Sequence, residues 1–325
     1  MVGNIIALAI LVAVVVLFAM LTRRAWRSKR RALKWIGVVL SGLLTVLLGL
    51  ISVFALIGLF KIYSPRTTPI PNVKISATTD TIAHGKHLAD VACAGCHSAN
   101  DSLPLTGSTR SLSEDFGIDI GTVYAPNLTP ASRIKSWSDG ELVRAIRVGI
   151  DPKGNILAVM TSNHFNEFSD DDLNAIVAYL RNSDAIVRDV PTENLNLLAA
   201  IFTGAGLFPD PPLLADKPIS APEKSPHAEY GKYLVTIGGC EDCHGKGFGG
   251  SEGGLSPPGP NLTVIVPKWT RDDFLKTIRS GVDPTGHALD PKQMPWKSFA
   301  KFDDTELGAI FEFIKTLPVV VKSAK

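Results

Sequence analysis

The chain opens with two long apolar stretches. Residues 5–21 are apolar without interruption, and residues 35–60 carry no charge and only Ser41, Thr45 and Ser52 as clear polar positions. A helix as long as the first stretch spans roughly 26 Å, close to the thickness of the hydrocarbon layer of a bilayer. The pattern therefore predicts a transmembrane hairpin within residues 1–60.

The segment between these stretches, residues 22–34, reads TRRAWRSKRRALK and carries seven positive charges and no acid. Short loops rich in Lys and Arg stay in the cytoplasm, so we expect the N-terminus and everything after residue 60 on the outer side. A signal peptide is disfavoured because a charged n-region and a small-residue cleavage site are lacking. A single anchor at 35–60 remains an alternative. A basic nucleic-acid patch is not expected between two apolar spans.

After residue 60 the apolar positions recur at helical spacing in short segments. Ser138 stands three positions before Glu141, the spacing of a capping box, and apolar residues follow at helical period. Ser169 and Asp303 open two further segments of this kind. Long loops rich in Gly and Pro separate these segments. The fold class predicted for this region is all-α.

The region also repeats itself. GKHLADVACAGCH (85–97) parallels GKYLVTIGGCEDCH (231–244), PNLT (126–129) recurs at 260–263, and RAIRVGIDPKG (144–154) parallels KTIRSGVDPTG (276–286). Such self-similarity indicates two copies of one structural unit. We expect a hairpin at 1–60, a Pro-rich tether at 61–78, a first domain at 79–189, a linker at 190–223 and a second domain at 224–325.

The linker contains NLLAAIFTGAGLF (196–208), which is too apolar for a free connector. We expect it to pack across the two domains, against a partner, or on the membrane surface.

All four cysteines of the chain lie in two C-x-x-C-H patterns, CAGCH at 93–97 and CEDCH at 240–244. Two thiols at this spacing add to the vinyl groups of one haem, and the following His ligates the iron. A thioredoxin-like pair, a disulfide and a zinc site are the alternatives, but a redox pair needs no following His, and the two pairs lie too far apart for a compact zinc ribbon. The cofactors predicted are two covalently bound haem c groups. Their protein partners are the cysteines Cys93, Cys96, Cys240 and Cys243 and the axial ligands His97 and His244.

Two of the four methionines are candidates for the sixth iron ligand. Met1 is the first residue and Met20 lies in the first apolar stretch, which leaves Met160 and Met294, one after each haem motif. A Met opposite a His is a known arrangement in cytochromes c and raises the potential. We therefore predict Met160 and Met294 as iron ligands. His164, four residues after Met160, is a rival ligand for the first haem.

The order C-x-x-C-H, P-N-L, W-[ST]-x-x-x-[LF], a Met loop and a last amphipathic helix resembles a class I cytochrome c domain. GTVYAPNLTP and FSDDDLNAIVAYLRN look like the cytochrome c subunits of membrane-bound periplasmic dehydrogenases that oxidise alcohols and gluconate. Those subunits often carry three haem motifs, whereas this chain has two. The resemblance implies two transmembrane helices followed by two tandem class I cytochrome c domains.

The resemblance also implies roles for residues around the haem. The carbonyl of the Pro in P-N-L typically accepts a hydrogen bond from the axial His, which carries over to Pro126 for His97 and Pro260 for His244. Four further residues recur at matched positions and are candidates to bind haem propionates, with plain core packing or solvation as the alternative. They are Trp137, Trp269, Arg147 and Arg279.

These features favour an electron carrier over an enzyme. Two His/Met haems leave no open iron position, and no other catalytic motif is apparent. We expect a dihaem cytochrome on the periplasmic face of the inner membrane, whose partners are redox proteins and the membrane, with no nucleic acid. All 31 acidic residues follow residue 60, which favours a basic partner. The alternatives are a dihaem peroxidase with an open first haem and a haem-based sensor.

Overall fold

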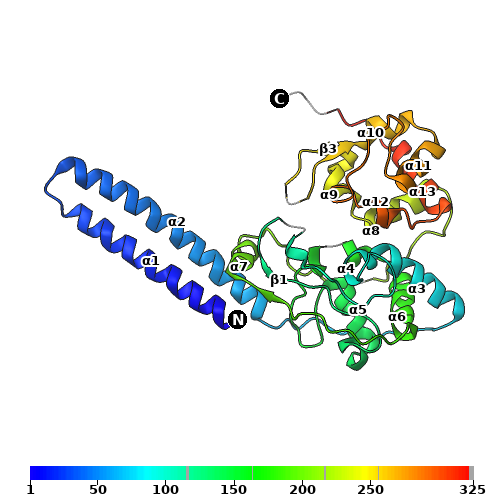
Figure 1. The fold of residues 1–325 in the computed structure, drawn as a ribbon, viewed down its shortest axis with the longest axis horizontal. Helices are drawn as coiled ribbons and strands as arrows, with labels where there is room; N and C mark the ends of the chain where they lie inside the picture. Colours follow the sequence, from blue (N-terminus) through cyan, green and yellow to red (C-terminus); the bar gives the residue numbers. More distant parts are fainter. Residues whose placement is uncertain (115–116, 163, 216, 255, 322–325) are drawn as a thin grey trace.

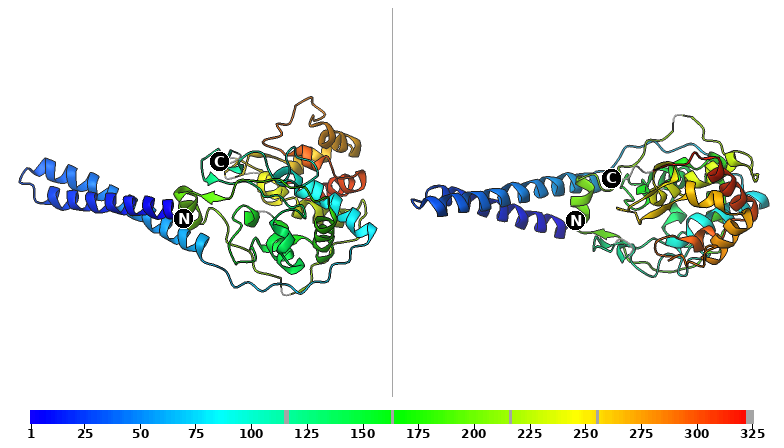
Figure 2. Two further views of the ribbon diagram at one scale, coloured as in Figure 1. Left: turned by 60° about the horizontal axis from the view of Figure 1, so that its bottom comes forward. Right: turned by 90° about the horizontal axis from the view of Figure 1, so that it is seen from above.

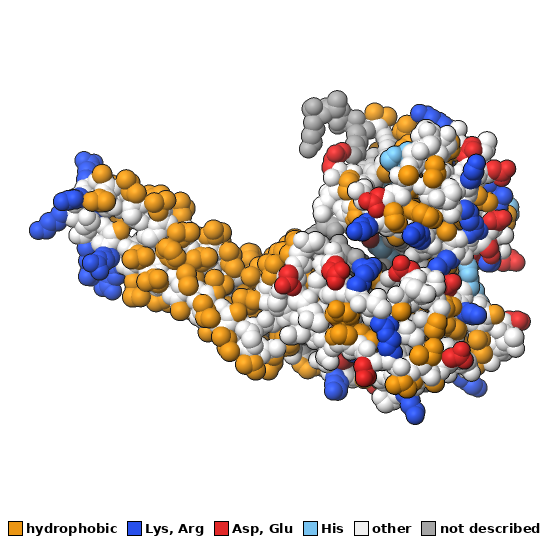
Figure 3. All heavy atoms as spheres, in the orientation of Figure 1, with side chains coloured by type: hydrophobic (Ala, Val, Ile, Leu, Met, Phe, Trp, Pro, Cys, Tyr) orange, Lys and Arg blue, Asp and Glu red, His pale blue; other side chains and the backbone are white. Residues whose placement is uncertain are grey.

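The computed structural model describes residues 1–114, 117–162, 164–215, 217–254 and 256–321. Helices α1 (Val2–Trp26) and α2 (Arg31–Tyr63) pack side by side as a hairpin that projects from the body of the molecule (Figure 1). Both are long and apolar enough to cross a membrane. Apolar side chains cover the hairpin and basic side chains gather at its tip (Figure 3). A hydrocarbon layer would cover this exposed apolar surface.

The linker after the first repeat packs against the hairpin. Helix α7 (Leu197–Gly204) crosses α2 so closely that a Cβ on Gly58 would lie 1.7 Å from the carbonyl oxygen of Ala200. Strand β2 (Asn194–Leu195), just before α7, pairs antiparallel with β1 (Gly121–Thr122). The buried Asn4 of α1 donates a hydrogen bond of 2.8 Å to the carbonyl of Leu195. The apolar linker is therefore a docking element between hairpin and body.

The Pro-rich segment 61–78 is also ordered. The amide of Arg66 donates to the carbonyl of Gly154 at 2.8 Å, and the guanidinium of Arg144 donates to the carbonyl of Thr68 at 2.9 Å. Figure 2 shows this segment running along the body between α2 and α3. The Pro-rich tether thus lies along the first repeat as a strap.

Residues 79–189, called here the first repeat, are mainly helical. Ser138 and Glu141 form the predicted capping box at the start of α5, and Ser169 caps α6. The elements are α3 (Thr79–Ala92), α4 (Ala94–His97), η1 (Leu112–Glu114), η2 (Arg133–Ser136), α5 (Asp139–Val148), η3 (Met160–Ser162), η4 (His164–Glu167) and α6 (Asp170–Asn182).

Residues 224–325, the second repeat, follow the same order. Asp303 and Glu306 form the capping box of the last helix. The elements are α8 (Ala228–Ile237), α9 (Cys240–His244), η5 (Lys246–Phe248), β3 (Gly249–Ser251), β4 (Gly259–Asn261), α10 (Leu262–Ile265), η6 (Val266–Lys268), α11 (Arg271–Ser280), α12 (Trp296–Phe299) and α13 (Asp304–Thr316). Strands β3 and β4 pair antiparallel. The body is thus mostly helical with two short two-stranded sheets among the described residues, whereas the sequence predicted helices alone.

In each repeat the first and last helices cross at a glycine. A Cβ on Gly85 of α3 would lie 1.8 Å from the carbonyl oxygen of Ala175 in α6, and one on Gly231 of α8 would lie 1.9 Å from that of Ala309 in α13. Only a residue without a side chain permits this approach of two backbones. The crossings place the C-x-x-C-H segments, which follow α3 and α8, at equivalent positions in the two repeats.

The segment GKYLVTIGGCEDCH has one residue more before its first Cys than GKHLADVACAGCH, and the structure shows where this residue is accommodated. Cys93 follows the end of α3 directly, whereas Gly238 and Gly239 separate α8 from Cys240. Gly239 takes a left-handed conformation, with φ of 62°. A glycine adopts this conformation at little cost, so the insertion is absorbed at the turn before the motif.

Candidate functional site

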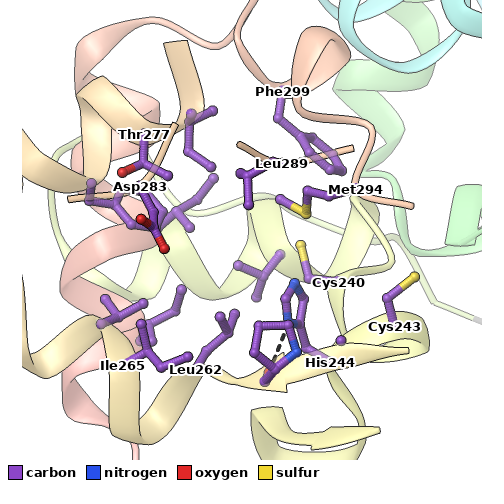
Figure 4. Close-up of a pocket in the computed structure, with 18 of the residues that line it drawn as sticks. Cys240, Cys243, His244, Leu262, Ile265, Thr277, Asp283, Leu289, Met294 and Phe299 are labelled. Carbon is purple, nitrogen blue, oxygen red and sulfur yellow. Dashed lines mark hydrogen bonds between the residues drawn. The ribbon is translucent and has the colours of Figure 1, made fainter. Parts of the chain in front are cut away.

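The second repeat encloses a cavity of about 410 Å³ beside its C-x-x-C-H motif. Figure 4 shows Cys240 and His244 on one side of this cavity and Met294 approaching from the other. Most of its remaining walls are apolar, and they include Leu234, Leu262, Ile265, Trp269, Phe274, Ile278, Leu289, Phe299, Phe302, Leu307, Ile310 and Ile314. The cavity is of the size and polarity of a cofactor site.

The residues at this cavity fit a covalently attached haem. Cys240 and Cys243 supply two thiols at its edge, His244 an imidazole and Met294 a thioether. Haem c needs this donor set, with two thiols for attachment and nitrogen and sulfur for the axial positions. The apolar walls suit the macrocycle. The structure thus brings together the predicted attachment and ligand residues of the second motif.

The imidazole of each C-x-x-C-H motif is fixed in the same way. Nδ1 of His244 lies 3.0 Å from the carbonyl oxygen of Pro260, and Nδ1 of His97 lies 2.9 Å from that of Pro126. With Nδ1 donating to the carbonyl, Nε2 keeps its lone pair for a metal. Burial lowers the pKa of His97 to about 4 and also lowers that of His244. Both rings are therefore neutral, the form that ligates iron.

Each Pro belongs to a segment whose asparagine is tied to the chain after the last helix. Nδ2 of Asn127 donates to the carbonyl of Ile186 at 2.8 Å, and Nδ2 of Asn261 donates to that of Val320 at 2.7 Å. These bonds hold the P-N-L-T segments in place in both repeats. The repeated PNLT sequence is therefore a structural brace behind the axial histidines.

The cysteines of the two motifs differ in exposure, since Cys96 is exposed and the other three are partly buried. Burial raises the pKa of Cys93 and of Cys240 to about 12. Within the described part of the chain, no group of three or more His, Cys, Asp or Glu residues is arranged to hold a metal ion. The geometry thus favours thioether attachment over a zinc site.

The first repeat separates the two rivals for its sixth ligand. Met160 is half-buried in η3, and the preceding residue, Val159, packs on a small apolar cluster beside the hairpin. Nε2 of His164 instead lies 3.0 Å from both carboxylate oxygens of Asp242, in the second repeat. The imidazole of His164 is therefore engaged across the boundary between the repeats.

Arg147 and Arg279 brace the Met segments. Arg147 is buried and donates to the carbonyls of Asn166 and Phe168, while its Nη2 lies 2.7 Å from Asp170. Arg279 bonds the carbonyl of Ala300 and lies 3.0 Å from Asp304, which are the equivalent positions. These donors hold the turn before the last helix, and propionate binding by the two arginines stays a prediction.

The tryptophans differ from the arginines. Trp269 lines the cavity of the second repeat, and Trp137 packs against the core of the first with the guanidinium of Arg133 5.6 Å from its ring centre. The position of Trp269 suits a side chain beside a cofactor. Sequence reasoning missed His164 as a contact between the repeats, because its partner lies 78 positions away in the chain.

Known proteins support the same interpretation of the site. Residues 82–184 match the cytochrome c family, and residues 226–314 match the family of cytochrome c oxidase, cbb3-type, subunit III. The chain is 27% identical to the cytochrome c subunit of a quinone-type alcohol dehydrogenase from Gluconobacter oxydans (strain 621H), over 74% of this chain and 55% of the relative. It is 25% identical to the gluconate 2-dehydrogenase cytochrome c subunit of Pantoea cypripedii, over 73% of this chain and 59% of the relative.

A shorter match, 31% identical over 41% of this chain and 28% of the relative, joins it to the fructose dehydrogenase cytochrome subunit of Gluconobacter japonicus. The chain spans a little over half the length of the first two relatives. Both repeats thus match known families, and the two matched ranges contain the two C-x-x-C-H motifs.

Proposed function

We propose that this chain, whose two repeats match the cytochrome c and cbb3-type subunit III families, is a membrane-anchored dihaem electron carrier. In this proposal Cys93 and Cys96 attach the first haem and Cys240 and Cys243 the second. The axial ligands are His97 with Met160 and His244 with Met294. When bound, the haem supplies a centre that gains and loses one electron.

The chain's own residues prepare the two sites for electron transfer. The carbonyls of Pro126 and Pro260 fix the orientation of the imidazoles, and the apolar walls exclude water, which favours a high potential. With a His and a Met as ligands, each iron would have no open position for a substrate. The protein thus transfers electrons without itself catalysing a chemical conversion, which makes it the carrier part of an oxidoreductase system.

The relatives indicate the kind of partner. They are cytochrome c subunits of dehydrogenases for alcohol, gluconate and fructose. We propose that this chain accepts electrons from a dehydrogenase and delivers them to a membrane or soluble acceptor. The single observation that carries the proposal is the second cavity, where two thiols, a fixed imidazole and a thioether meet.

For the membrane, we propose a two-pass anchor with the N-terminus and both repeats on the periplasmic side. The length of α1 and α2 and the basic tip of their hairpin support it. Trypsin added to spheroplasts should cleave the repeats and spare the basic segment 22–34. Trypsin added to inverted vesicles should do the reverse, and cleavage of 22–34 from outside would refute this orientation.

An optical redox titration of the purified protein, with carbon monoxide added to the reduced form, tests the function. We expect two low-spin haems at high potential and no spectral change with carbon monoxide. The Met294→Ala variant is the positive control, because it opens one iron position and should bind carbon monoxide. Carbon monoxide binding by the unaltered protein would refute the carrier and turn the search to a peroxidase with an open haem.

A further inference from the structure

The two repeats meet through contacts that occur in pairs. Nε2 of His87 in the first repeat lies 2.9 Å from the carboxylate of Glu306 in the second. In return, the hydroxyl of Tyr233 in the second repeat donates to the carboxylate of Asp172 in the first. His87 and Tyr233 each stand two residues after the crossing glycine of their repeat. Asp172 and Glu306 each stand immediately before Leu173 and Leu307.

A second pair of contacts also joins equivalent positions of the two repeats. His164 stands four residues after Met160 and contacts Asp242, just before the second Cys of the other motif. Ser298 stands four residues after Met294, and its hydroxyl lies 3.4 Å from where a Cβ on Gly95 would be. Gly95 stands just before Cys96, the equivalent place.

The elements around these side chains are exchanged in the same way. Helix α8 of the second repeat contacts η4 of the first, and α3 of the first contacts α12 of the second. When position i of one copy contacts position j of the other, and j contacts i, the copies are related by a two-fold axis. The repeats thus form an internal pair with approximate two-fold symmetry, within one chain.

The carboxylates at this boundary are held firmly. Glu306 is fully buried and also accepts from Nζ of Lys224 at 3.1 Å. Asp172 is buried and lies 2.6 Å from Nε2 of His84. Removing one partner of a buried charge leaves it uncompensated, so such contacts resist sliding of the two surfaces. The contacts therefore define one relative placement of the repeats.

We propose that this two-fold boundary holds each Met segment against the C-x-x-C-H segment of the other repeat, and that His164 is a positioning residue that sets the separation of the two haem sites. The inference rests on the proposed function. An electron lost by one site is gained by the other, with no bond made or broken. A fixed separation lets the two sites exchange electrons directly at one rate, so the chain acts as one two-electron store.

The separation of the repeats can be measured without any redox assay. In the haem-loaded protein the native cysteines are held as thioethers, so spin labels attach to cysteines introduced at the exposed positions Lys153 and Lys276. In this K153C/K276C background we expect one narrow distance distribution. Adding His164→Ala with Tyr233→Phe should broaden it or shift it to longer distance.

Two further variants separate positioning from general damage. His164→Asn keeps an amide that donates to Asp242 and should retain the narrow distribution. His227→Ala removes an exposed histidine that makes no capping bond at the start of α8, and it should change nothing. A distribution that stays narrow in the His164→Ala/Tyr233→Phe variant, or is already broad in the parent, overturns the inference.

Electron exchange provides a second readout. After rapid reduction of part of the haem, redistribution between the two sites should be slower in His164→Ala than in the His227→Ala control. The two midpoint potentials should keep their values, because His164 ligates neither iron. A lost or shifted potential would instead mark His164 as a ligand and refute its positioning role. The redox titration with carbon monoxide tests the proposed function separately, since it does not depend on the distance.

Discussion

The two repeats share one plan but are attached differently. In the first, the axial His and its Pro partner are 29 positions apart, and in the second they are 16 apart. The longer segment of the first repeat carries β1 and much of a separate apolar cluster, which also takes in Leu195 and Ala199 from the linker and Ile62 from the end of α2. The shorter segment of the second repeat forms the paired strands β3 and β4, and Gly259 and Pro260 of β4 line the cavity.

The difference teaches how a duplicated unit is specialised. The first repeat is fastened to the hairpin by the strap, by the β1–β2 pair and by α7, which crosses α2. The second repeat is held by the paired contacts at the two-fold boundary. The longer segment between His97 and Pro126 thus attaches the first repeat to the hairpin, and we call it, with α7 and β2, the mount. The residues just before Met160 pack against this mount. This arrangement places the first repeat directly beside the hairpin.

The largest expected effect comes from removing one attachment site at a time. Cys240→Ala with Cys243→Ala should leave about one covalent haem per chain, because each motif binds one haem. The first repeat and the hairpin should stay folded. Mass spectrometry and the haem absorbance measure the stoichiometry.

The matched change, Cys93→Ala with Cys96→Ala, should do more damage. It removes the haem from the repeat that carries the mount, so the strap at residues 61–78 should become sensitive to protease. If the two double variants lose the same amount of protein and show the same protease pattern, the proposed asymmetry between the repeats is wrong.

Gly58→Val should give the next largest effect. A side chain at Gly58 meets the backbone of Ala200, so α7 must separate from α2, and overpacking of this kind costs about 1–3 kcal/mol or more. Gly49→Val in the same helix is the control, since nothing lies within 4 Å of its Cβ position. Thermal unfolding in detergent micelles should show a lower midpoint for Gly58→Val alone, and equal midpoints would remove α7 from the mount.

Arg144→Met tests the strap by itself. Arg144 is buried, and its two Nη atoms donate to the carbonyls of Thr68 and Asp151. Leaving such acceptors unpaired costs about 1–3 kcal/mol of unfolding free energy. Lys276 occupies the equivalent position of the second repeat and is exposed, so Lys276→Met should change the free energy by about 0.5 kcal/mol or less. Denaturant unfolding followed by the haem absorbance compares the two variants, and equal costs would mean that the strap adds nothing.

Local patterns in the sequence predicted much of this molecule. The C-x-x-C-H spacing, the duplicated segments and the capping residues Ser138 and Asp303 each act over a few residues, and their structural counterparts lie where the patterns predict. The contacts that join the parts were not predictable in this way. His87 and Glu306 are 219 positions apart, and Asn4 and Leu195 are 191 apart.

The local sequence around His87, Glu306, Asn4 and Leu195 does not indicate which residues they contact. Arg147 illustrates the limit, since its repetition is visible in the sequence but its bonds to the turn before the last helix are not. Its partners are backbone carbonyls, which carry no sequence signal. The packing of α7 on α2 was not predicted for a related reason. An apolar stretch indicates that its surface will be buried, but it does not indicate which element will bury it.

The smallest expected effect concerns pH and again separates the repeats. Hydrogen bonding to Asp172 raises the pKa of His84 above its ordinary 6.5, although burial opposes this. Burial would raise the pKa of Asp172, but its bonds to His84 and Tyr233 lower it below 3.8. The His84 contribution is therefore complete below pH 6.5 and is lost as the pH rises through its higher folded value. The Asp172 contribution is complete above pH 3.8 and is lost as the pH falls further.

The second repeat has Tyr230 at the position of His84, so it lacks this titration. As the pH rises above 6.5, we expect the thermal unfolding midpoint of the first repeat to decrease slightly. The midpoint of the second repeat should stay constant over the same pH range. His84→Asn should flatten the first profile, and an unchanged slope in that variant would assign the pH dependence to another group.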